Sequence, residues 1–154
     1  MEIVDVRTGI RKKVIITRAE IGDFKTLTKK RYSFSWKTIR ELTAVYKLCI
    51  EGNDDIFGVI GLINWSEEKR IEIKLLASSA ENIGKEKHYS GIAGCLIAFA
   101  CREAVIQFGI EACVSLVPKT ELIEHYMNNY YMQNAGRQLY LDGPNLMKLL
   151  KNYL

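Results

Sequence analysis

The feature that most constrains this chain is the stretch from His88 to Phe108, where small residues give way at once to a long apolar helical pattern. Gly91, Ala93 and Gly94 stand where that helix would begin. The first N–H groups of a helix have no partner inside it, and they carry the positive end of the helix dipole. The sequence therefore predicts a phosphate-binding site at this point. Close packing of the helix on a sheet is the alternative interpretation, and it explains Gly94 equally well.

The chain has 154 residues, a length that suits one domain, residues 1–154, with a sizeable core. Its first ten residues contain acids and no apolar block, and the longest nearly apolar run, Gly91–Cys101, is too short to span a bilayer. We therefore expect a cytoplasmic protein with no membrane partner. The cysteines lie in apolar segments without a Cys-x-x-Cys pair and the two histidines lie far apart, so we expect free thiols and no metal.

Positive charge is concentrated in the first third of the chain. Residues 1–48 hold twelve lysines and arginines against five acids, or +7, whereas residues 49–154 hold ten against thirteen, or −3, which together give the net +4. The cations are scattered rather than aligned on one helix face. A solvated surface, or an electrostatic funnel for an anionic cofactor, is the favoured interpretation, and nucleic-acid binding is the less favoured one.

Hydrophobic periodicity predicts one continuous series of strands and helices. Strands are predicted at Lys13–Arg18, Thr43–Ile50, Ile56–Trp65, Arg70–Ala77, Ile110–Val117 and Arg137–Leu141, and helices at Ala19–Tyr32, Lys37–Leu42, Gly91–Phe108, Thr120–Met132 and from Gly143 onward. Short turns between the second, third and fourth strands favour an antiparallel meander. The strand after the long helix would run parallel to Arg70–Ala77. The expected class is a mixed α/β (α+β) fold, with a mostly antiparallel, twisted sheet of about six strands and four to five helices.

This order of elements resembles the GNAT family of N-acetyltransferases from about Lys13 to Leu141. The family signature Gln/Arg-x-x-Gly-x-Gly/Ala stands here as His88-Tyr89-Ser90-Gly91-Ile92-Ala93, with His88 replacing Gln or Arg. The resemblance implies acetyl-CoA as cosubstrate and no metal. Its implied cofactor contacts are the N–H groups of Tyr89, Ser90, Gly91, Ile92, Ala93 and Gly94 for pyrophosphate, a hydrogen bond from His88, and the strand backbone of Leu75, Leu76 and Ala77 for pantetheine.

The same resemblance suggests roles for two side chains near the C-terminal helices. Tyr126 would protonate the departing CoA thiolate, although an aromatic on a helix stripe is also an ordinary core residue. Lys119 stands where the family often has a cofactor-binding asparagine. The family's Tyr-Gly-Phe becomes Tyr130-Tyr131-Met132, so the turn after this helix is expected to differ.

An amine nucleophile also needs a base, because it arrives mostly as ammonium. Glu72 is the best candidate, and Glu81 is the second. For Glu72 the alternative is a solvent-facing carboxylate paired with Lys74 or Arg70.

The sequence thus predicts an acyltransferase that moves an acetyl group from acetyl-CoA to a small-molecule or peptide primary amine by direct attack. The alternative is a catalytically weak or inactive GNAT-fold module that binds CoA or a partner, which the atypical Lys119, Tyr131 and Ala77 favour. The resemblance implies an acceptor pocket built from residues 24–36 and the C-terminal third, where Tyr32, Phe34 and Trp36 either line it or belong to the core. The identity of the acceptor and a homodimeric state are left open.

Overall fold

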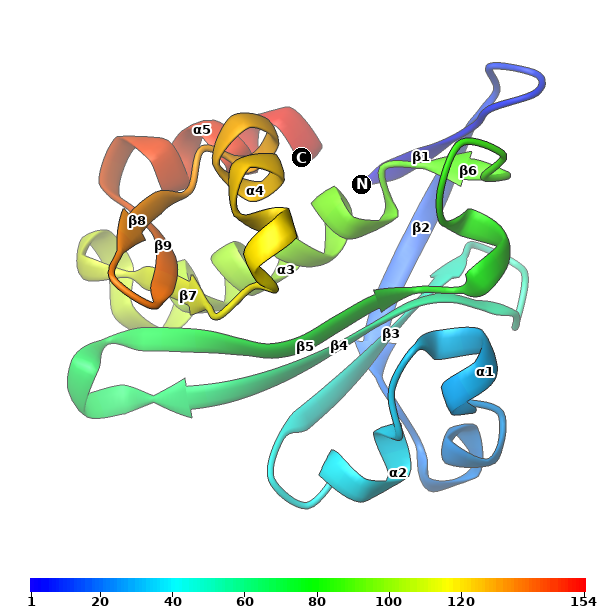
Figure 1. Ribbon diagram of the computed structural model, residues 1–154, viewed down its shortest axis with the longest axis horizontal. Coiled ribbons are helices and arrows are strands. Elements are labelled where there is room, and N and C mark those ends of the chain that lie inside the picture. Colours follow the sequence, from blue (N-terminus) through cyan, green and yellow to red (C-terminus); the bar gives the residue numbers. More distant parts are fainter. The chain divides into compact units, whose positions relative to one another are not determined.

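The structure is a computed structural model that describes residues 1–154, and these divide into two compact units. Unit 1 comprises Met1–Gly61 and Leu75–Leu96, and unit 2 comprises Leu62–Lys74 and Ile97–Leu154. Strands β4 (Ile56–Trp65) and β5 (Arg70–Ser78) and helix α3 (Ile92–Phe108) each contribute residues to both units. Figure 1 labels the helices and strands and colours them in chain order.

Strand pairing follows the order β6-β1-β2-β3-β4-β5-β7-β9-β8, so the mostly antiparallel sheet has nine strands rather than about six. The remaining strands are β1 (Glu2–Asp5), β2 (Arg11–Arg18), β3 (Ala44–Ile50), β6 (Tyr89–Ser90), β7 (Cys113–Leu116), β8 (Gln133–Ala135) and β9 (Gln138–Asp142), and the other α-helices are α1 (Lys29–Tyr32), α2 (Trp36–Ile39), α4 (Ile123–Tyr130) and α5 (Gly143–Tyr153). The expected mixed fold with four to five helices is confirmed, and the structure has five α-helices.

Three short strands, β1, β6 and β8, are absent from the sequence-based prediction. β1 pairs antiparallel with β2, and β6 pairs antiparallel with β1 through Val4↔Ser90 and Asp5↔Tyr89. Strands of two to four residues are too short for a period of two to stand out in the sequence. Their existence depends on a partner strand that lies far away in the chain.

The single helix predicted over Ala19–Tyr32 is wrong. This segment forms a 3-10 turn, η1 (Ile21–Lys25), followed by the one-turn helix α1. The Glu20 N–H donates to Asp23 Oδ2 at 2.8 Å, and the Arg31 N–H donates to Thr28 Oγ1 at 3.4 Å. Side chains that bond neighbouring backbone N–H groups compete with a continuous helix, so two such caps divide the segment.

Other boundaries shift where 3-10 turns take over the ends of predicted elements. Gly109–Glu111 forms η4, so β7 is shorter than the predicted strand, and Thr120–Leu122 forms η5 ahead of α4. The parallel pairing of β5 with β7 is confirmed and runs from Arg70↔Cys113 to Ile73↔Leu116. β5 continues to Ser78, beyond the last residue paired with β7.

The core of unit 1 contains the aromatic residues that stood as candidates for an acceptor pocket. Tyr32 and Trp36 are fully buried. The Tyr32 hydroxyl donates to the Ile56 carbonyl at 2.8 Å, and the Trp36 indole N–H donates to the Tyr32 carbonyl at 2.9 Å. Phe34 packs against the same cluster. These aromatics therefore hold the α1–α2 segment on the sheet, because their polar atoms are satisfied within the fold.

Helix α3 is apolar along most of its length, as the sequence indicated. The expectation that the apolar run is too short to span a bilayer does not hold for the helix as a whole, because with η4 it is long and apolar enough by length and composition alone, and 56% of that window is buried within the fold. Gly109 ends the helix in a left-handed conformation at φ +64°.

Candidate functional site

The start of α3 leaves backbone donors free. Gly91 has φ +96°, which favours glycine, and the Cys95 N–H donates to the Gly91 carbonyl at 3.0 Å as the first helical hydrogen bond. The N–H groups of Ile92, Ala93 and Gly94 precede that bond and have no acceptor inside the helix. We call these three N–H groups, with the turn at Gly91, the helix-start site. It can receive an anion.

One donor expected just before Gly91, the Tyr89 N–H, is already used within the fold. The Tyr89 N–H donates to Asn82 Oδ1 at 2.9 Å, and the His88 N–H donates to the Glu81 carbonyl at 3.1 Å. Ser90 lies in β6, opposite Val4. Tyr89 is therefore removed from the predicted set of phosphate-binding N–H groups, because its N–H donates to Asn82 within the loop and is not available to a ligand.

A buried network fixes this loop. Asn82 lies in the 3-10 turn η3 (Ala80–Asn82), and its Nδ2 donates to Ser79 Oγ at 2.8 Å. Both side chains are buried, and the Ser79 N–H donates to the Phe57 carbonyl at 2.9 Å. One asparagine thus ties the end of β5 to the backbone just before the helix-start site. The sequence-based prediction missed Asn82, because its partner Tyr89 lies seven residues along a polar loop.

The first turn of α3 lies directly on β4. A Cβ at Gly58 would stand 2.6 Å from Ile92 Cγ2 and 3.0 Å from Leu96 Cδ1. A glycine inside a strand often marks this kind of close approach. Tight helix–sheet packing therefore does occur here, but the glycine that permits it belongs to the strand. At Gly91 an added Cβ would meet nothing closer than 3.9 Å, so the backbone conformation is what requires glycine there.

The three residues expected to pair with pantetheine lie on β5 past its ladder with β7. That ladder stops at Ile73, and Leu75, Leu76 and Ala77 follow it. Leu75 and Leu76 are half-buried and Ala77 is buried.

Glu72 lies on β5 among polar side chains of unit 2. Its Oε1 accepts the indole N–H of Trp65 at 2.9 Å. The expected partner Arg70 instead forms an ion pair with Glu68 and donates to Ser115 Oγ at 2.7 Å. Glu72 is half-buried, and the Trp65 indole positions its carboxylate.

Glu81, the second candidate base, is held by Arg31. The two form a bidentate pair, Nη2 to Oε1 at 2.6 Å and Nε to Oε2 at 3.3 Å. Hydrogen bonding to the guanidinium lowers the pKa of Glu81 to about 2. A carboxylate with so low a pKa holds a proton poorly near neutral pH, which argues against Glu81 as the base.

Tyr126 lies on α4 within a cluster of aromatic rings. Its ring centroid is 5.7 Å from that of His125 and 5.8 Å from that of Tyr130. Burial raises the pKa of Tyr126, so the phenol stays protonated at neutral pH and can donate. Tyr126 therefore belongs to an aromatic stripe on α4, and its protonated hydroxyl can still donate a hydrogen bond.

Comparison with known proteins gives a match in structure but none in sequence. No protein-family profile and no curated protein matches the chain. The toxin AtaT, in a structure with the antitoxin AtaR C-terminus and acetyl-CoA, matches with a TM-score of 0.58 at 13% identity over 88% of this chain and 97% of AtaT. Ard1 from Thermoplasma volcanium matches with a TM-score of 0.62 at 13% identity, over 84% of this chain and 97% of Ard1. The chain has the GNAT fold.

A third GNAT-fold structure, a Bacillus subtilis acetyltransferase in complex with CoA, matches with a TM-score of 0.54 at 15% identity over 85% of this chain and 98% of that one. The GNAT resemblance expected from the residues around Gly91 is thus confirmed for the fold.

Two departures from the GNAT pattern have different structural outcomes. Lys119 is the exposed residue that precedes η5, with an extended backbone. Tyr131 takes the left-handed conformation at φ +59°, the region that favours glycine, and its hydroxyl accepts from Asn152 Nδ2 at 2.6 Å. The turn after α4 therefore has a glycine-like backbone despite the tyrosine side chain.

The cysteines and acids form no further reactive group. All four cysteines are free, and burial raises the pKa of Cys95 to about 11 and that of Cys101 to about 12. The structure contains no group of three or more His, Cys, Asp or Glu side chains that could hold a metal ion.

Proposed function

We propose that this chain is an acetyl-CoA-dependent N-acetyltransferase that acetylates a primary amine by direct attack. The observation that carries the proposal is the helix-start site, whose three free N–H groups open α3 directly after a loop fixed by Asn82. GNAT-fold neighbours that bind acetyl-CoA or CoA support it.

The residues at hand fit the cosubstrate. The pyrophosphate of acetyl-CoA would accept hydrogen bonds from the N–H groups of Ile92, Ala93 and Gly94, because a helix start favours negative charge. The backbone of Leu75 to Ala77 would pair with pantetheine, with His88 and Lys119 as further contacts. Binding both reactants on one protein makes the transfer effectively unimolecular.

The chemistry needs one base and one acid. A base, for which Glu72 is the candidate, takes the proton of the ammonium, and the free amine attacks the thioester carbonyl. The C–N bond forms, the C–S bond breaks, and Tyr126 gives its proton to the departing thiolate, while the surplus proton leaves the new amide nitrogen and restores the Tyr126 phenol. The raised pKa of Tyr126 suits this role, since a phenol must be protonated to act as an acid.

The rival function is a GNAT-fold module that binds CoA or a partner without turnover. Lys119 in the place of the usual asparagine is the observation that favours it. Release of CoA thiol in the presence of a panel of amines, amino acids and peptides would distinguish the two.

The deciding experiment begins with titration of acetyl-CoA by calorimetry. We expect saturable binding in wild type and none in Gly91→Glu, whose side chain adds bulk and negative charge beside the helix-start site. No heat at millimolar acetyl-CoA would end the proposal. Binding without thiol release across the whole panel would favour the rival.

A further inference from the structure

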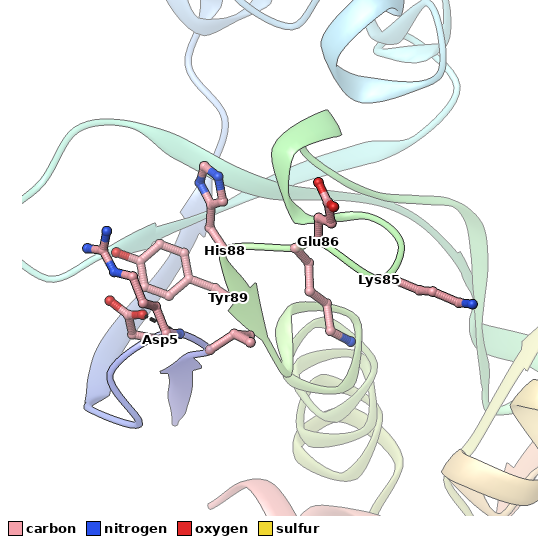
Figure 2. A pocket seen from close by; sticks show the side chains of 8 residues that line it. Asp5, Lys85, Glu86, His88 and Tyr89 are labelled. Atoms are coloured by element: carbon pink, nitrogen blue, oxygen red, sulfur yellow. Dashed lines mark hydrogen bonds between the residues drawn. The ribbon is translucent and has the colours of Figure 1, made fainter.

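The outer edge of β2, the edge that faces away from β3, is only partly covered. Its first three residues pair with β1, and the Val14 N–H donates to the Met1 carbonyl at 3.0 Å. β1 is itself covered by β6, and Figure 2, which looks into a pocket at this margin of the sheet, shows Asp5 of β1 beside Tyr89 of β6. Beyond Val14 no strand of the chain pairs with this edge, so residues 15–19 leave it open. We call this segment the free edge.

Hydrogen bonds to β3 show which groups of the free edge point outward. The Ala19 N–H donates to the Val45 carbonyl at 2.9 Å, so Ala19 faces β3. Residues of an antiparallel strand face its two neighbours alternately, so Thr17 also faces β3, whereas Ile16 and Arg18 face away from it. The N–H and C=O groups of Ile16 and Arg18 therefore point outward, and no backbone hydrogen bond within the chain uses them.

The free edge is flanked by exposed apolar side chains. Ile15 is 46% exposed, and Ile21, two residues past Ala19 in η1, is 83% exposed. Thr17 and Arg18 are exposed as well, and Arg18 is the only charged side chain of the segment. Charged residues and proline commonly protect an open strand edge from pairing. A single charge and no proline leave this edge able to pair with another strand.

We infer that the free edge pairs with the free edge of a second copy of this chain, the two strands running antiparallel about a twofold axis. One antiparallel register uses every outward group. It sets Ile16 of each copy opposite Arg18 of the other, so that each copy donates two hydrogen bonds and accepts two, and the two Thr17 residues meet at the axis. Ile15 then lies opposite Ala19 of the second copy, and apolar surface on both copies is buried.

The symmetry of the free edge favours a second copy over a foreign strand. Its outward groups stand evenly on either side of Thr17, and the segment is bounded by β1 at one end and by η1 at the other. Registers centred on Ile16 or on Arg18 leave outward groups unpaired, because the next N–H groups, those of Val14 and Glu20, are already bonded within the chain. The edge is thus complementary to itself in a single register.

This pairing has one electrostatic cost, which sets the sign of its salt dependence. The two Arg18 residues are diagonal neighbours across the axis on the same face, with backbones roughly 7–8 Å apart, and their like charges repel. Salt screens exposed charges, so dimerisation should strengthen as salt is added. An acidic foreign strand attracted by Arg18 would instead bind more weakly as salt is added.

Sedimentation equilibrium from micromolar to millimolar protein tests the inference, and wild type should show a monomer–dimer equilibrium. Arg18→Pro should weaken dimerisation at least about 10-fold, because each copy loses one bridging N–H. The substitution leaves the bonds to β3 in place, since this N–H points away from β3. Arg18→Ala is the matched control. It keeps the N–H and removes the like charges, so it should dimerise at least as tightly as wild type.

Cross-linking tests the register directly. In a non-hydrogen-bonded antiparallel pair the Cα atoms are about 4.5 Å apart, within the roughly 4.4–6.8 Å that a disulfide spans. Oxidation should therefore convert Thr17→Cys into a disulfide-linked dimer, and this arm also serves if Arg18→Pro does not fold. Thr8→Cys, in the exposed turn between β1 and β2, is the control and should cross-link far more slowly.

Three outcomes would overturn the inference. One is a wild type that stays monomeric at millimolar concentration, another is equal dimerisation of Arg18→Pro and Arg18→Ala, and the third is cross-linking of Thr17→Cys no faster than that of Thr8→Cys. A monomeric wild type that binds a synthetic peptide of alternating glutamate and valine, when Arg18→Pro does not, would assign the edge to a foreign strand. None of these readouts uses acetyl-CoA, so the proposed function stands or falls separately.

Discussion

Arg31 of α1 and Glu81 of η3 form a bidentate ion pair that connects two segments fifty residues apart. The backbone carbonyl of Glu81 also accepts the His88 N–H, at 3.1 Å. Helix α1 lies in the region that the sequence assigned to the acceptor pocket. Through Arg31 it is therefore hydrogen-bonded to the loop that positions the helix-start site. A change at either residue is expected to affect this loop.

Glu81→Gln should lower the free energy of unfolding at pH 7 by about 1–2 kcal/mol, because the charge-assisted bonds to Arg31 are weakened. The folded pKa of about 2 lies below the ordinary 4.5, so this contribution is full above pH 4.5 and declines as the pH falls towards 2. Urea unfolding of wild type and variant across this range should show the two curves converging. Glu2→Gln is the control, since Glu2 only meets Arg11 at 3.8 Å on the surface, and a constant difference at all pH values would contradict the prediction.

Gly91→Ala should weaken acetyl-CoA binding by at least 10-fold. A side chain at φ +96° costs roughly 1–2 kcal/mol and shifts the backbone that presents the N–H of Ile92. Gly136→Ala is the matched control, because Gly136 has φ +72°, open space around it and a place in the β8–β9 turn. Calorimetry and thermal unfolding should show a similar stability loss in both but a binding loss only at Gly91. If both variants bind acetyl-CoA equally well, the turn at Gly91 has no role in binding acetyl-CoA.

Asn82→Ala should destabilise the chain by about 1–3 kcal/mol, because the buried Tyr89 N–H and Ser79 hydroxyl both lose a partner. It should also weaken acetyl-CoA binding, since the backbone before Gly91 is released. Ser79→Ala removes the Ser79 bonds to Asn82 and to the Glu81 carboxylate but keeps the Asn82–Tyr89 bond, so it should reduce stability with little effect on binding. Hydrogen exchange of residues 83–91 provides the direct measurement. If the amides of residues 83–91 are as protected from exchange in Asn82→Ala as in wild type, contacts other than those of Asn82 hold the loop in place.

Tyr126→Phe should reduce kcat by about 10²-fold while leaving the affinity for acetyl-CoA unchanged, because it removes a proton donor and keeps the ring packing. Thiol release under saturating amine measures this. Tyr140→Phe, which removes a half-buried phenol on β9, should retain wild-type kcat. A Tyr126→Phe enzyme with full activity would assign this tyrosine to the helix core alone.

Glu72→Gln should lower kcat/KM by about 10²-fold, with the loss partly recovered at high pH, where more of the amine arrives unprotonated. The substitution preserves an oxygen that can accept the Trp65 indole N–H, so the geometry should persist. Glu67→Gln, on the exposed turn after β4, is the control. The pH profile of kcat/KM decides the matter, because a purely structural carboxylate would change the rate equally at every pH.

Local patterns in the sequence were sufficient for the long elements and for the helix start. Alternation and apolar runs predicted β3, β4, β5 and α3 within a residue or two, because these segments are long enough to show their periods. Gly91 was identifiable because it stands with other small residues directly ahead of a long apolar helical pattern. The order of those elements was enough for the resemblance to the GNAT fold.

Tertiary structure alone decided the rest, because the partners lie far apart in the chain. The pairing of β6 with β1, the Arg31–Glu81 ion pair and the approach of Ile92 to Gly58 each join residues separated by at least thirty positions. The sequence predicted that the Tyr89 N–H would bind the ligand, but in the fold this N–H donates to Asn82 Oδ1. It gave Glu81 as the second candidate base, and in the fold the Arg31 guanidinium binds this carboxylate. Residue type determined which groups could serve, and three-dimensional proximity determined which ones remain free.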